Sequence, residues 1–247
     1  MAEPLTPAEA ARLRRLQIRA FGLTWLSYAS YYLVRKNVSV VKSTLTDTLG
    51  ITVGQLGAMD TFYLAAYALG QFVNGALGDR LGARRVIGLG MLASAAAAFV
   101  MGMSGTALVF ITVFGLNGFF QSTGWPNNVK AMQPWFPART RGKIMGFWCT
   151  NYQVGGLVAT ALATFLMVTF GWRWAFFVPG TWVAMVGGAI LLFLVERPQD
   201  KGLPPVEDSD APDPAGAIPD APPAEEPKVA FFQMLRMPAV WSLGGAY

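Results

Sequence analysis

Six long apolar segments occupy most of the first 195 residues, and they constrain the fold more than any other feature of the sequence. They cover residues 20–41, 53–77, 86–103, 106–129, 144–169 and 174–195. About 20 apolar residues are enough for a helix to cross a bilayer. Inside a bilayer, only α-helices and closed barrels satisfy every backbone hydrogen bond. The sequence therefore predicts an all-α polytopic membrane protein, with six transmembrane helices in residues 20–195.

The composition narrows the functional class. Hydrophobic residues make up 53% of the 247 residues and charged residues 13%, which is unusual for a soluble domain. The chain has no histidine and one cysteine, Cys149. It therefore offers neither a nucleophile–base pair nor a cluster of metal ligands. We expect no enzyme activity, no metal site and no cofactor.

The basic residues indicate how the chain crosses the membrane. Eleven of them belong to the side that carries the amino terminus: Arg12, Arg14, Arg15, Arg19, Arg80, Arg84, Arg85, Lys130, Arg139, Arg141 and Lys143. Only Lys42 and Arg173 belong to the opposite side. Because short cytoplasmic loops carry the excess of Lys and Arg, residues 1–19 are predicted to be cytoplasmic. Within them, Thr6 and Glu9 have the spacing of a helix capping box.

The composition changes abruptly after the sixth segment. Residues 196–228 contain frequent prolines and nine acidic residues against three basic ones. Such a segment is predicted to be a disordered cytoplasmic linker. Residues 229–247 are apolar again and read as the start of a second transmembrane half. We therefore expect this chain to be the amino-terminal portion of a longer protein.

Two adjacent cations, Arg35 and Lys36, lie within the first apolar segment. Each costs about 2.5–3.5 kcal/mol at the centre of a membrane helix, so such residues normally face a partner or a water-filled path. On one continuous helix Tyr28, Tyr32 and Arg35 share a face, with Lys36 beside it. A guanidinium matches phosphate or carboxylate oxygens in pairs, which predicts an anion-binding site. The alternative is that Arg35 reaches out to lipid headgroups.

Polar stripes run along three other predicted helices. The second contains Asp60, Tyr63, Tyr67, Gln71 and Asn74, the fourth contains Asn117, Gln121, Gly124 and Asn128, and the fifth contains Asn151, Tyr152 and Gln153. Each stripe alone is equally consistent with hydrogen bonds between helices. Together with Arg35 they favour helices that line one aqueous cavity, and Tyr67, Gln71, Asn151 and Tyr152 join the predicted substrate site.

Asp60 lies at about the same predicted depth as the two cations of the first helix. An aspartate facing lipid there is costly. We expect it to form an ion pair with Lys36 or Arg35, and a proton-coupling role is the alternative.

The loop between the second and third apolar segments has a distinctive pattern of glycines and charges. Its marked residues are Gly75, Asp79, Arg80, Gly82, Arg84 and Arg85. This loop resembles the signature loop of the major facilitator superfamily. The resemblance implies twelve helices in two six-helix halves, of which residues 1–195 are the first, and a role for the loop in gating.

A narrower resemblance concerns the organophosphate:phosphate antiporters, which include glycerol-3-phosphate and hexose-phosphate transporters. Residues 28–37 resemble their first helix, residues 124–126 and 135–136 their fourth helix and the loop after it, and residues 141–156 their fifth-helix signature. The resemblance implies exchange of a phosphate ester for inorganic phosphate by alternating access, across the plasma membrane of a bacterium. It also implies that Arg35 binds the phosphoryl group.

The chain departs from that family pattern at three positions. Tyr152 stands where the pattern has a histidine, Cys149 where it has an asparagine, and Gln71 where the glycerol-3-phosphate branch has a lysine. The alternative function is a sensor with a transporter fold, which binds a sugar phosphate and signals to a partner membrane protein. In either case the expected partners are a small anion, inorganic phosphate and the bilayer, and not nucleic acid.

Overall fold

The computed structural model describes residues 5–206, and every regular element in that range is a helix. The elements are α1 (Pro7–Leu33), α2 (Lys36–Leu49), α3 (Val53–Leu81), α4 (Ala83–Met103), α5 (Ala107–Gln121), α6 (Gly124–Met132), the 3₁₀ helix η1 (Gln133–Trp135), α7 (Ala138–Trp148), α8 (Thr150–Phe170), α9 (Trp174–Phe193) and the 3₁₀ helix η2 (Pro198–Lys201). The predicted all-α class is confirmed. The predicted seventh segment, residues 229–247, lies outside the described residues.

The predicted capping box at the start of α1 is confirmed. The Thr6 hydroxyl accepts a hydrogen bond from the Glu9 amide at 3.3 Å, and the Glu9 carboxylate accepts one from the Thr6 amide at 2.9 Å. The hydrogen bonds from the Thr6 side chain and backbone lower the pKa of the Glu9 carboxyl below its usual range. This exchange satisfies two backbone donors that an uncapped helix leaves free.

All six predicted apolar segments form helix, but three of them are interrupted. The breaks fall at Val34 and Arg35, at Ser122 and Thr123, and at Cys149. By length and hydropathy alone, four stretches of residues 5–206 are able to cross a membrane: Ala83–Met103, Ala107–Trp135, Ala138–Phe170 and Trp174–Phe193. The first two predicted segments do not meet that criterion, because polar residues along both of them lower their mean hydropathy.

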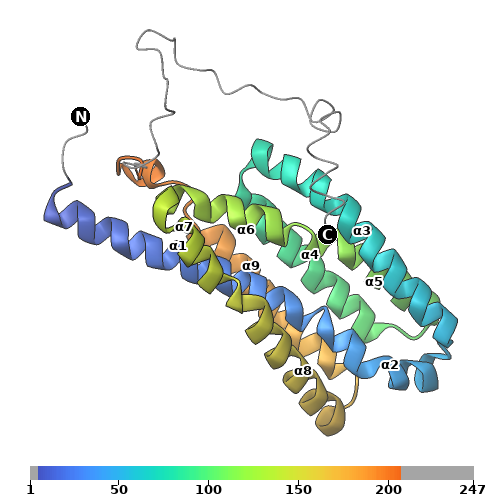
Figure 1. Ribbon diagram of the computed structural model, residues 1–247. Coiled ribbons are helices and arrows are strands. Elements are labelled where there is room, and N and C mark those ends of the chain that lie inside the picture. Colours follow the sequence, from blue (N-terminus) through green and yellow to red (C-terminus); the bar gives the residue numbers. More distant parts are fainter. Residues whose placement is uncertain (1–4, 207–247) are drawn as a thin grey trace. The chain divides into compact units, whose positions relative to one another are not determined.

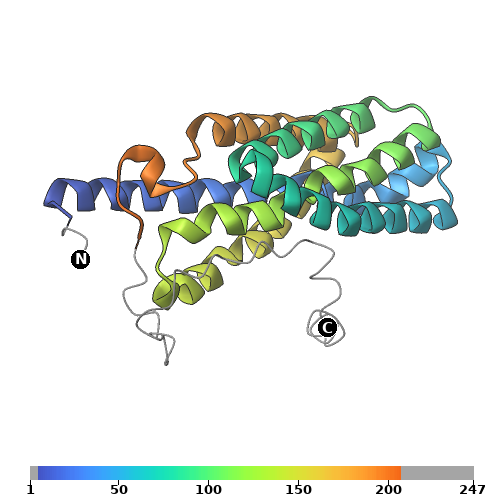
Figure 2. The same ribbon diagram turned by 90° about the horizontal axis from the view of Figure 1, so that it is seen from above.

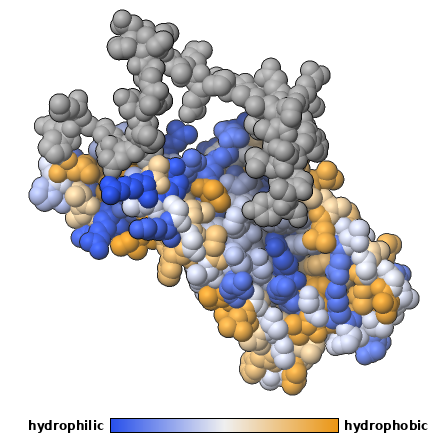
Figure 3. All heavy atoms as spheres, viewed as in Figure 1, coloured by the Kyte–Doolittle hydropathy of each residue, from blue (hydrophilic) through white to orange (hydrophobic). Residues whose placement is uncertain are grey.

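The helices pack as pairs of neighbours that are distant in sequence. Figures 1 and 2 show α4 side by side with α9, which is the most extensive pairing, and α3 packs along α5. Helix α1 packs against α8, α9 and α6. On the face shown in Figure 3, strongly hydrophilic residues gather near the start of α1, while many hydrophobic residues lie exposed farther along the helices. Exposed apolar side chains in such numbers fit helices that contact lipid.

Residues 196–206 belong to the predicted linker, yet they form defined contacts. Glu196 accepts a hydrogen bond from the Arg84 amide at 3.0 Å, and η2 follows immediately. Pro198 and Leu203 are buried. A carboxylate partner and two buried side chains hold this stretch in place, which its composition did not indicate. Residues 207–228 of the predicted linker lie outside the described residues.

Close contact between α1 and α8 depends on a glycine. A Cβ atom placed on Gly155 would lie 2.6 Å from the Ala29 carbonyl oxygen, closer than real Cβ contacts allow. The next residue, Gly156, has ordinary space, because its nearest neighbour is a Tyr32 ring carbon at 3.9 Å. The backbones of α1 and α8 therefore approach at Gly155 in the way that small residues permit in membrane bundles.

We predict that Gly155→Ala destabilises the full-length protein, because the new methyl group must push α8 away from α1. Overpacking of this kind costs roughly 1–3 kcal/mol. Thermal unfolding of the purified protein should show a melting temperature lower by several degrees. The matched control is Gly156→Ala, which should melt at or above the wild-type temperature, since alanine is favoured over glycine in helices by about 1 kcal/mol. Equal melting temperatures for the two variants would contradict the close contact.

Candidate functional site

The site is built around the break between α1 and α2. Helix α1 ends at Leu33, and the Arg35 amide donates a 3.2 Å hydrogen bond to the Tyr32 carbonyl in a tight turn. The sequence predicted one continuous helix through residues 28–39. That prediction is wrong, because the turn at Val34 and Arg35 redirects the chain and places α2 on a new course. Asn37 secures the start of α2 by donating to the Ala175 carbonyl of α9 at 2.8 Å.

The break leaves the Val34 carbonyl without a partner in its own helix, and two side chains of α5 supply one. Asn117 Nδ2 donates to this oxygen at 3.2 Å and Gln121 Nε2 at 3.3 Å. Ser94 of α4 donates to Asn117 Oδ1 at 2.6 Å and accepts from Gln121 Nε2 at 3.3 Å. All three side chains are fully buried. This network satisfies the interrupted backbone, which is the condition for irregular chain at membrane depth.

The Arg35 guanidinium lies among three tyrosine rings. Its central carbon is 4.8 Å from the ring centre of Tyr67, 5.1 Å from that of Tyr32 and 5.7 Å from that of Tyr63. At such distances the ring faces attract a cation. The aromatic residues thus replace part of the water that Arg35 loses.

A hydrogen bond to α5 helps to fix the orientation of Arg35. Its Nε donates to Gln121 Oε1 at 2.8 Å, and the Tyr63 hydroxyl donates to the same oxygen at 2.9 Å. The buried Nη2 of Arg35 has no hydrogen-bond partner among the described residues, and none of their carboxylates forms an ion pair with it. The guanidinium therefore keeps its positive charge and a free donor, which is the chemistry that recognises an anion.

The structure brings together only part of the predicted substrate set. Tyr32 and Tyr67 contact Arg35, as described above. Tyr28 is buried, with its ring 5.4 Å from those of Trp125 and Trp148 and 5.9 Å from that of Tyr32. Lys36 is exposed, so its side chain does not join the cluster around Arg35.

The remaining three predicted residues have separate surroundings. Asn151 is buried and donates to the Trp148 carbonyl at 2.6 Å, while its Oδ1 has no partner within residues 5–206. Tyr152 is 36% exposed, and Gln71 is half-buried. Their part in substrate binding stays a prediction.

Sequence reasoning did not assign three residues that the site depends on. Tyr63 and Gln121 belong to the predicted polar stripes, and their helical spacing indicated that they face the same cavity as Arg35. They were nevertheless not included in the predicted site. No sequence pattern pointed to Ser94, because it lies in a run of small residues that is typical of close helix packing.

Asp60 forms its ion pair with a residue that was not expected. Its carboxylate lies 2.5 Å from Lys42 Nζ of α2, and both side chains are partly exposed. The prediction that Asp60 pairs with Lys36 or Arg35 is wrong. The turn at residues 34–35 explains the difference, since it rotates α2 relative to the face that a continuous helix would have presented.

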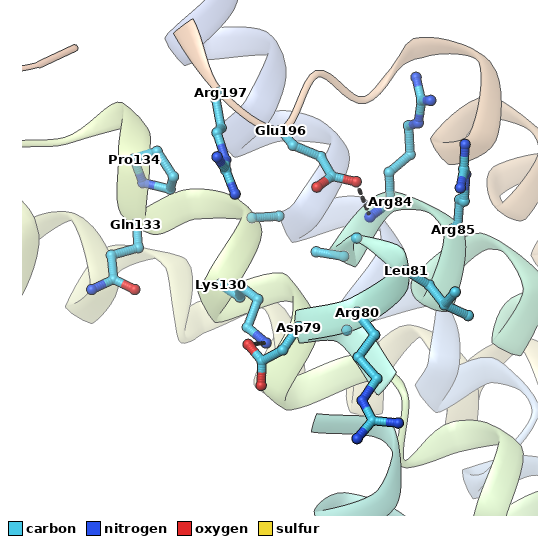
Figure 4. Close-up of a pocket in the computed structure, with 14 residues that line it drawn as sticks. Asp79, Arg80, Leu81, Arg84, Arg85, Lys130, Gln133, Pro134, Glu196 and Arg197 are labelled. Atoms are coloured by element: carbon cyan, nitrogen blue, oxygen red, sulfur yellow. Dashed lines mark hydrogen bonds and ion pairs between the residues drawn. The ribbon is translucent and has the colours of Figure 1, made fainter. Parts of the chain in front are cut away.

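A second polar site lies where α3 ends and α4 begins (Figure 4), and the predicted loop of residues 75–85 is helical except at Gly82. Asp79 pairs with Lys130 of α6, and Lys130 also donates to the Gly75 carbonyl at 3.2 Å. Gly82 has a φ of +88°, which favours glycine, and the Glu196 carboxylate lies over it. A pocket of about 460 Å³ is lined by charged and glycine residues of this site: Asp79, Arg80, Gly82, Arg84, Arg85, Lys130 and Glu196.

Three of the four arginines that line this pocket are Arg80, Arg84 and Arg85, and none of these three pairs with Asp79. Figure 4 shows the guanidinium groups of Arg80, Arg84 and Arg85 pointing away from the Asp79–Lys130 pair. Asp79 is thus tied to α6, and Glu196 is tied to the start of α4 through the Arg84 amide. A role for this loop in gating stays a prediction.

Among residues 5–206, no group of three or more His, Cys, Asp or Glu side chains is arranged to hold a metal ion. The polar groups of the site are a guanidinium, hydroxyls and amides, which suit an anion rather than a cation.

A partly buried arginine beside a helix break, inside an all-helical bundle of apolar helices, fits a polytopic membrane protein. The model of the Major Facilitator Superfamily matches residues 24–247, and the chain belongs to this family. The predicted resemblance to the family is thereby confirmed.

Several curated relatives are similar to this chain. A probable hexose phosphate transport protein of Chlamydia pneumoniae is 31% identical over 191 residues, which cover 77% of this chain and 42% of the relative. The human glucose-6-phosphate exchanger SLC37A2 is 31% identical over 271 residues, covering 88% and 54%. The putative glycerol-3-phosphate transporter 5 of Arabidopsis thaliana is 34% identical over 206 residues, covering 75% and 42%. The chain spans about half the length of the curated relatives it matches.

A solved structure shares the fold. The crystal structure of a bacterial homologue of the human lysosomal transporter Spinster, in an inward-facing and unoccupied conformation, superposes with a TM-score of 0.68. The match covers 92% of this chain and 51% of that chain at 17% sequence identity. At this identity the likeness concerns the fold alone.

We predict that Asp60 is energetically coupled to Lys42 and not to Lys36. A double-mutant cycle with Lys42→Ala and Asp60→Ala in the full-length protein should give a coupling of about 0.2–1 kcal/mol, the range for partly exposed pairs. Denaturant or thermal unfolding measures it. The parallel cycle with Lys36→Ala provides the control and should give a coupling near zero. A larger coupling energy between Asp60 and Lys36 would contradict the ion pair with Lys42 and would support the pairing expected from a continuous helix.

Proposed function

We propose that the full-length protein exchanges a small phosphorylated metabolite for inorganic phosphate by alternating access. The observation that carries this proposal is the partly buried Arg35 at a helix break, whose buried Nη2 is free and which has no carboxylate partner among the described residues. The relatives, which include a probable hexose phosphate transport protein and a putative glycerol-3-phosphate transporter, support the same substrate class.

The chemistry of the site suits a phosphoryl group. A phosphate that leaves water needs fixed positive charge, and a guanidinium gives two parallel charge-assisted hydrogen bonds. Because Nε is already used by Gln121, the terminal nitrogens are the donors left for a ligand. The rings of Tyr32 and Tyr67 lie near the guanidinium, and a tyrosine hydroxyl is able to donate to a further phosphate oxygen.

A single cation at the site balances only half the charge of a dianion. Tyr152 stands where the antiporter pattern has a histidine, and Gln71 where its glycerol-3-phosphate branch has a lysine, so both add hydrogen-bond donors but no charge. We therefore propose that a second six-helix half supplies another cation, and that the site lies between the halves. We also propose that no bond of the substrate is broken, and that the loop of residues 75–85 acts in gating.

The test of this function is phosphate-driven uptake by vesicles that contain the full-length protein. Arg35→Ala should abolish uptake of labelled phosphate esters and their phosphate-competed binding. Removing one partner of a desolvated charge pair costs about 2–5 kcal/mol, which is roughly 30-fold to several thousand-fold in affinity. Arg35→Lys should retain only part of the wild-type affinity, because an ammonium lacks the planar fork of donors that a guanidinium has.

Lys36→Ala is the matched comparison for Arg35→Ala. It removes an adjacent cation that is exposed, whereas Arg35 is partly buried, so the loss of affinity should be much smaller. Both variants must reach the membrane and melt close to the wild-type temperature. Normal binding of phosphate esters by Arg35→Ala would overturn the anion-site proposal.

The same vesicles separate the transporter from the alternative. A sensor with this fold would bind the phosphate ester through Arg35 but would not accumulate it. Binding without uptake in wild-type vesicles would therefore favour the sensor and a partner membrane protein.

We propose further that the amino terminus is cytoplasmic and that the protein lies in the plasma membrane of a bacterium. In a Cys149→Ser background, an impermeant thiol reagent applied outside the cell should label Gly105→Cys and not Gly142→Cys. Both glycines are exposed and have open space for a side chain, so accessibility to the reagent reports the side of the membrane. Labelling after cell lysis serves as the control that both thiols react. The reverse pattern would invert the proposed orientation.

A further inference from the structure

We propose that a groove between α1 and α7 binds one anionic phospholipid, separately from the transported substrate. Side chains of α1 and α7 line it together. The groove has a volume of about 430 Å³, and its apolar lining includes Ile18, Phe21, Ile144 and Phe147. Arg14 and Lys143 also line it, and both are exposed.

The walls of the groove are exposed, yet they are well defined. The Phe21 and Phe147 rings stack with their centres 5.9 Å apart and their planes at 21°. Ile18 is 64% exposed and Phe147 is 67% exposed. Aromatic rings held in this way offer a shaped apolar surface, and an exposed apolar surface rimmed by charge marks a binding site.

The apolar lining continues along the same side of α1. Arg14, Ile18, Phe21 and Trp25 follow the i, i+4, i+7, i+11 spacing of one helix face. Trp25 lines a second apolar pocket of about 310 Å³ between α1, α8 and α9, and its Nε1 donates to Thr150 Oγ1 at 3.1 Å. From Arg14 to Trp25 the helix rises about 16 Å at ~1.5 Å per residue. This length is close to half of a bilayer core of about 30 Å, so it fits one acyl chain of one leaflet.

Charge distinguishes the two ends of this lining. The side chains of Arg14 and Lys143 are exposed, and neither forms an ion pair with another residue in the described part of the chain. The pocket beyond Trp25 is lined by no charged residue. A ligand that matches both ends has an anionic head near the membrane surface and an apolar tail below it. Phosphatidylglycerol has this chemistry, and cations near the surface attract anionic lipids.

The groove is distinct from the Arg35 site. Its residues lie on the early part of α1 and on α7, whereas Arg35 contacts side chains of α3 and α5 beyond the end of α1. Lipid binding in this groove therefore does not depend on the proposed transport function. An experiment can contradict either proposal without contradicting the other.

The experiment is native mass spectrometry of the purified full-length protein with phosphatidylglycerol and phosphatidylcholine of identical acyl chains. The wild-type protein should retain one phosphatidylglycerol in preference to phosphatidylcholine. Arg14→Ala/Lys143→Ala should weaken this binding by roughly 30-fold, since two surface cations are lost. The matched control is Arg12→Ala/Arg15→Ala, which removes the same charge from exposed residues of α1 outside the groove. It should retain the lipid within about twofold of wild type.

Two further variants test the groove itself. Ile18→Trp fills it while keeping both cations, and it should also release the lipid. Arg35→Ala should retain the lipid, and inorganic phosphate should not displace it, because phosphate has the charge without the acyl chain. Melting temperatures close to wild type must accompany each variant.

Three results would overturn the proposal. One is equal retention of the two lipids by the wild-type protein, as expected if another part of the full-length protein covers the groove. The second is equal weakening in the two double variants, which would indicate general surface attraction. The third is unchanged lipid binding by Ile18→Trp. That result would mean that the headgroup contacts the cations while no acyl chain occupies the groove.

Discussion

The hydrogen bonds to the Val34 carbonyl are the interaction on which the rest of the site depends. A helix that stops inside an apolar bundle exposes backbone groups that water cannot reach, and each unsatisfied group costs several kcal/mol. Here Asn117 and Gln121 of α5 both donate to the one freed oxygen. The same contacts fix α5 against the break and hold the Gln121 oxygen where Arg35 and Tyr63 meet it. The backbone interruption and the placement of the guanidinium are therefore one arrangement rather than two.

The surroundings of Arg35 leave its charge uncancelled. Its neighbours are three aromatic faces and an amide oxygen, all of them neutral. A carboxylate in contact with Arg35 would stabilise it more strongly, but it would also compete with any incoming anion. Asp60, the nearest candidate by predicted depth, pairs with Lys42 instead. The cluster thus lowers the cost of burying the cation without consuming its attraction for a ligand.

The apolar segments predicted the helices well, because bilayer length and backbone satisfaction leave few other solutions. Arg35 was identified because a cation within an apolar segment is costly unless it faces a partner or a water-filled path. The turn at Val34 and Arg35 was missed, because neither proline nor glycine marks it and the donors that stabilise it come from another helix about 85 residues away. Every error in the neighbourhood, including the partner of Asp60, follows from treating residues 20–41 as one straight helix. Ser94 was hidden for a related reason, because its importance lies entirely in tertiary contacts.

The contact of Glu196 with the α3–α4 loop has a consequence for the chain that follows it. The carboxylate sits over Gly82, where a larger residue would displace it, and it accepts from the Arg84 amide. The segment that leaves α9 is thereby joined to the start of α4 by a polar contact, in addition to the packing of α4 along α9. Loss of the Glu196 carboxylate would leave the Arg84 amide without this acceptor while every contact at Arg35 stays unchanged.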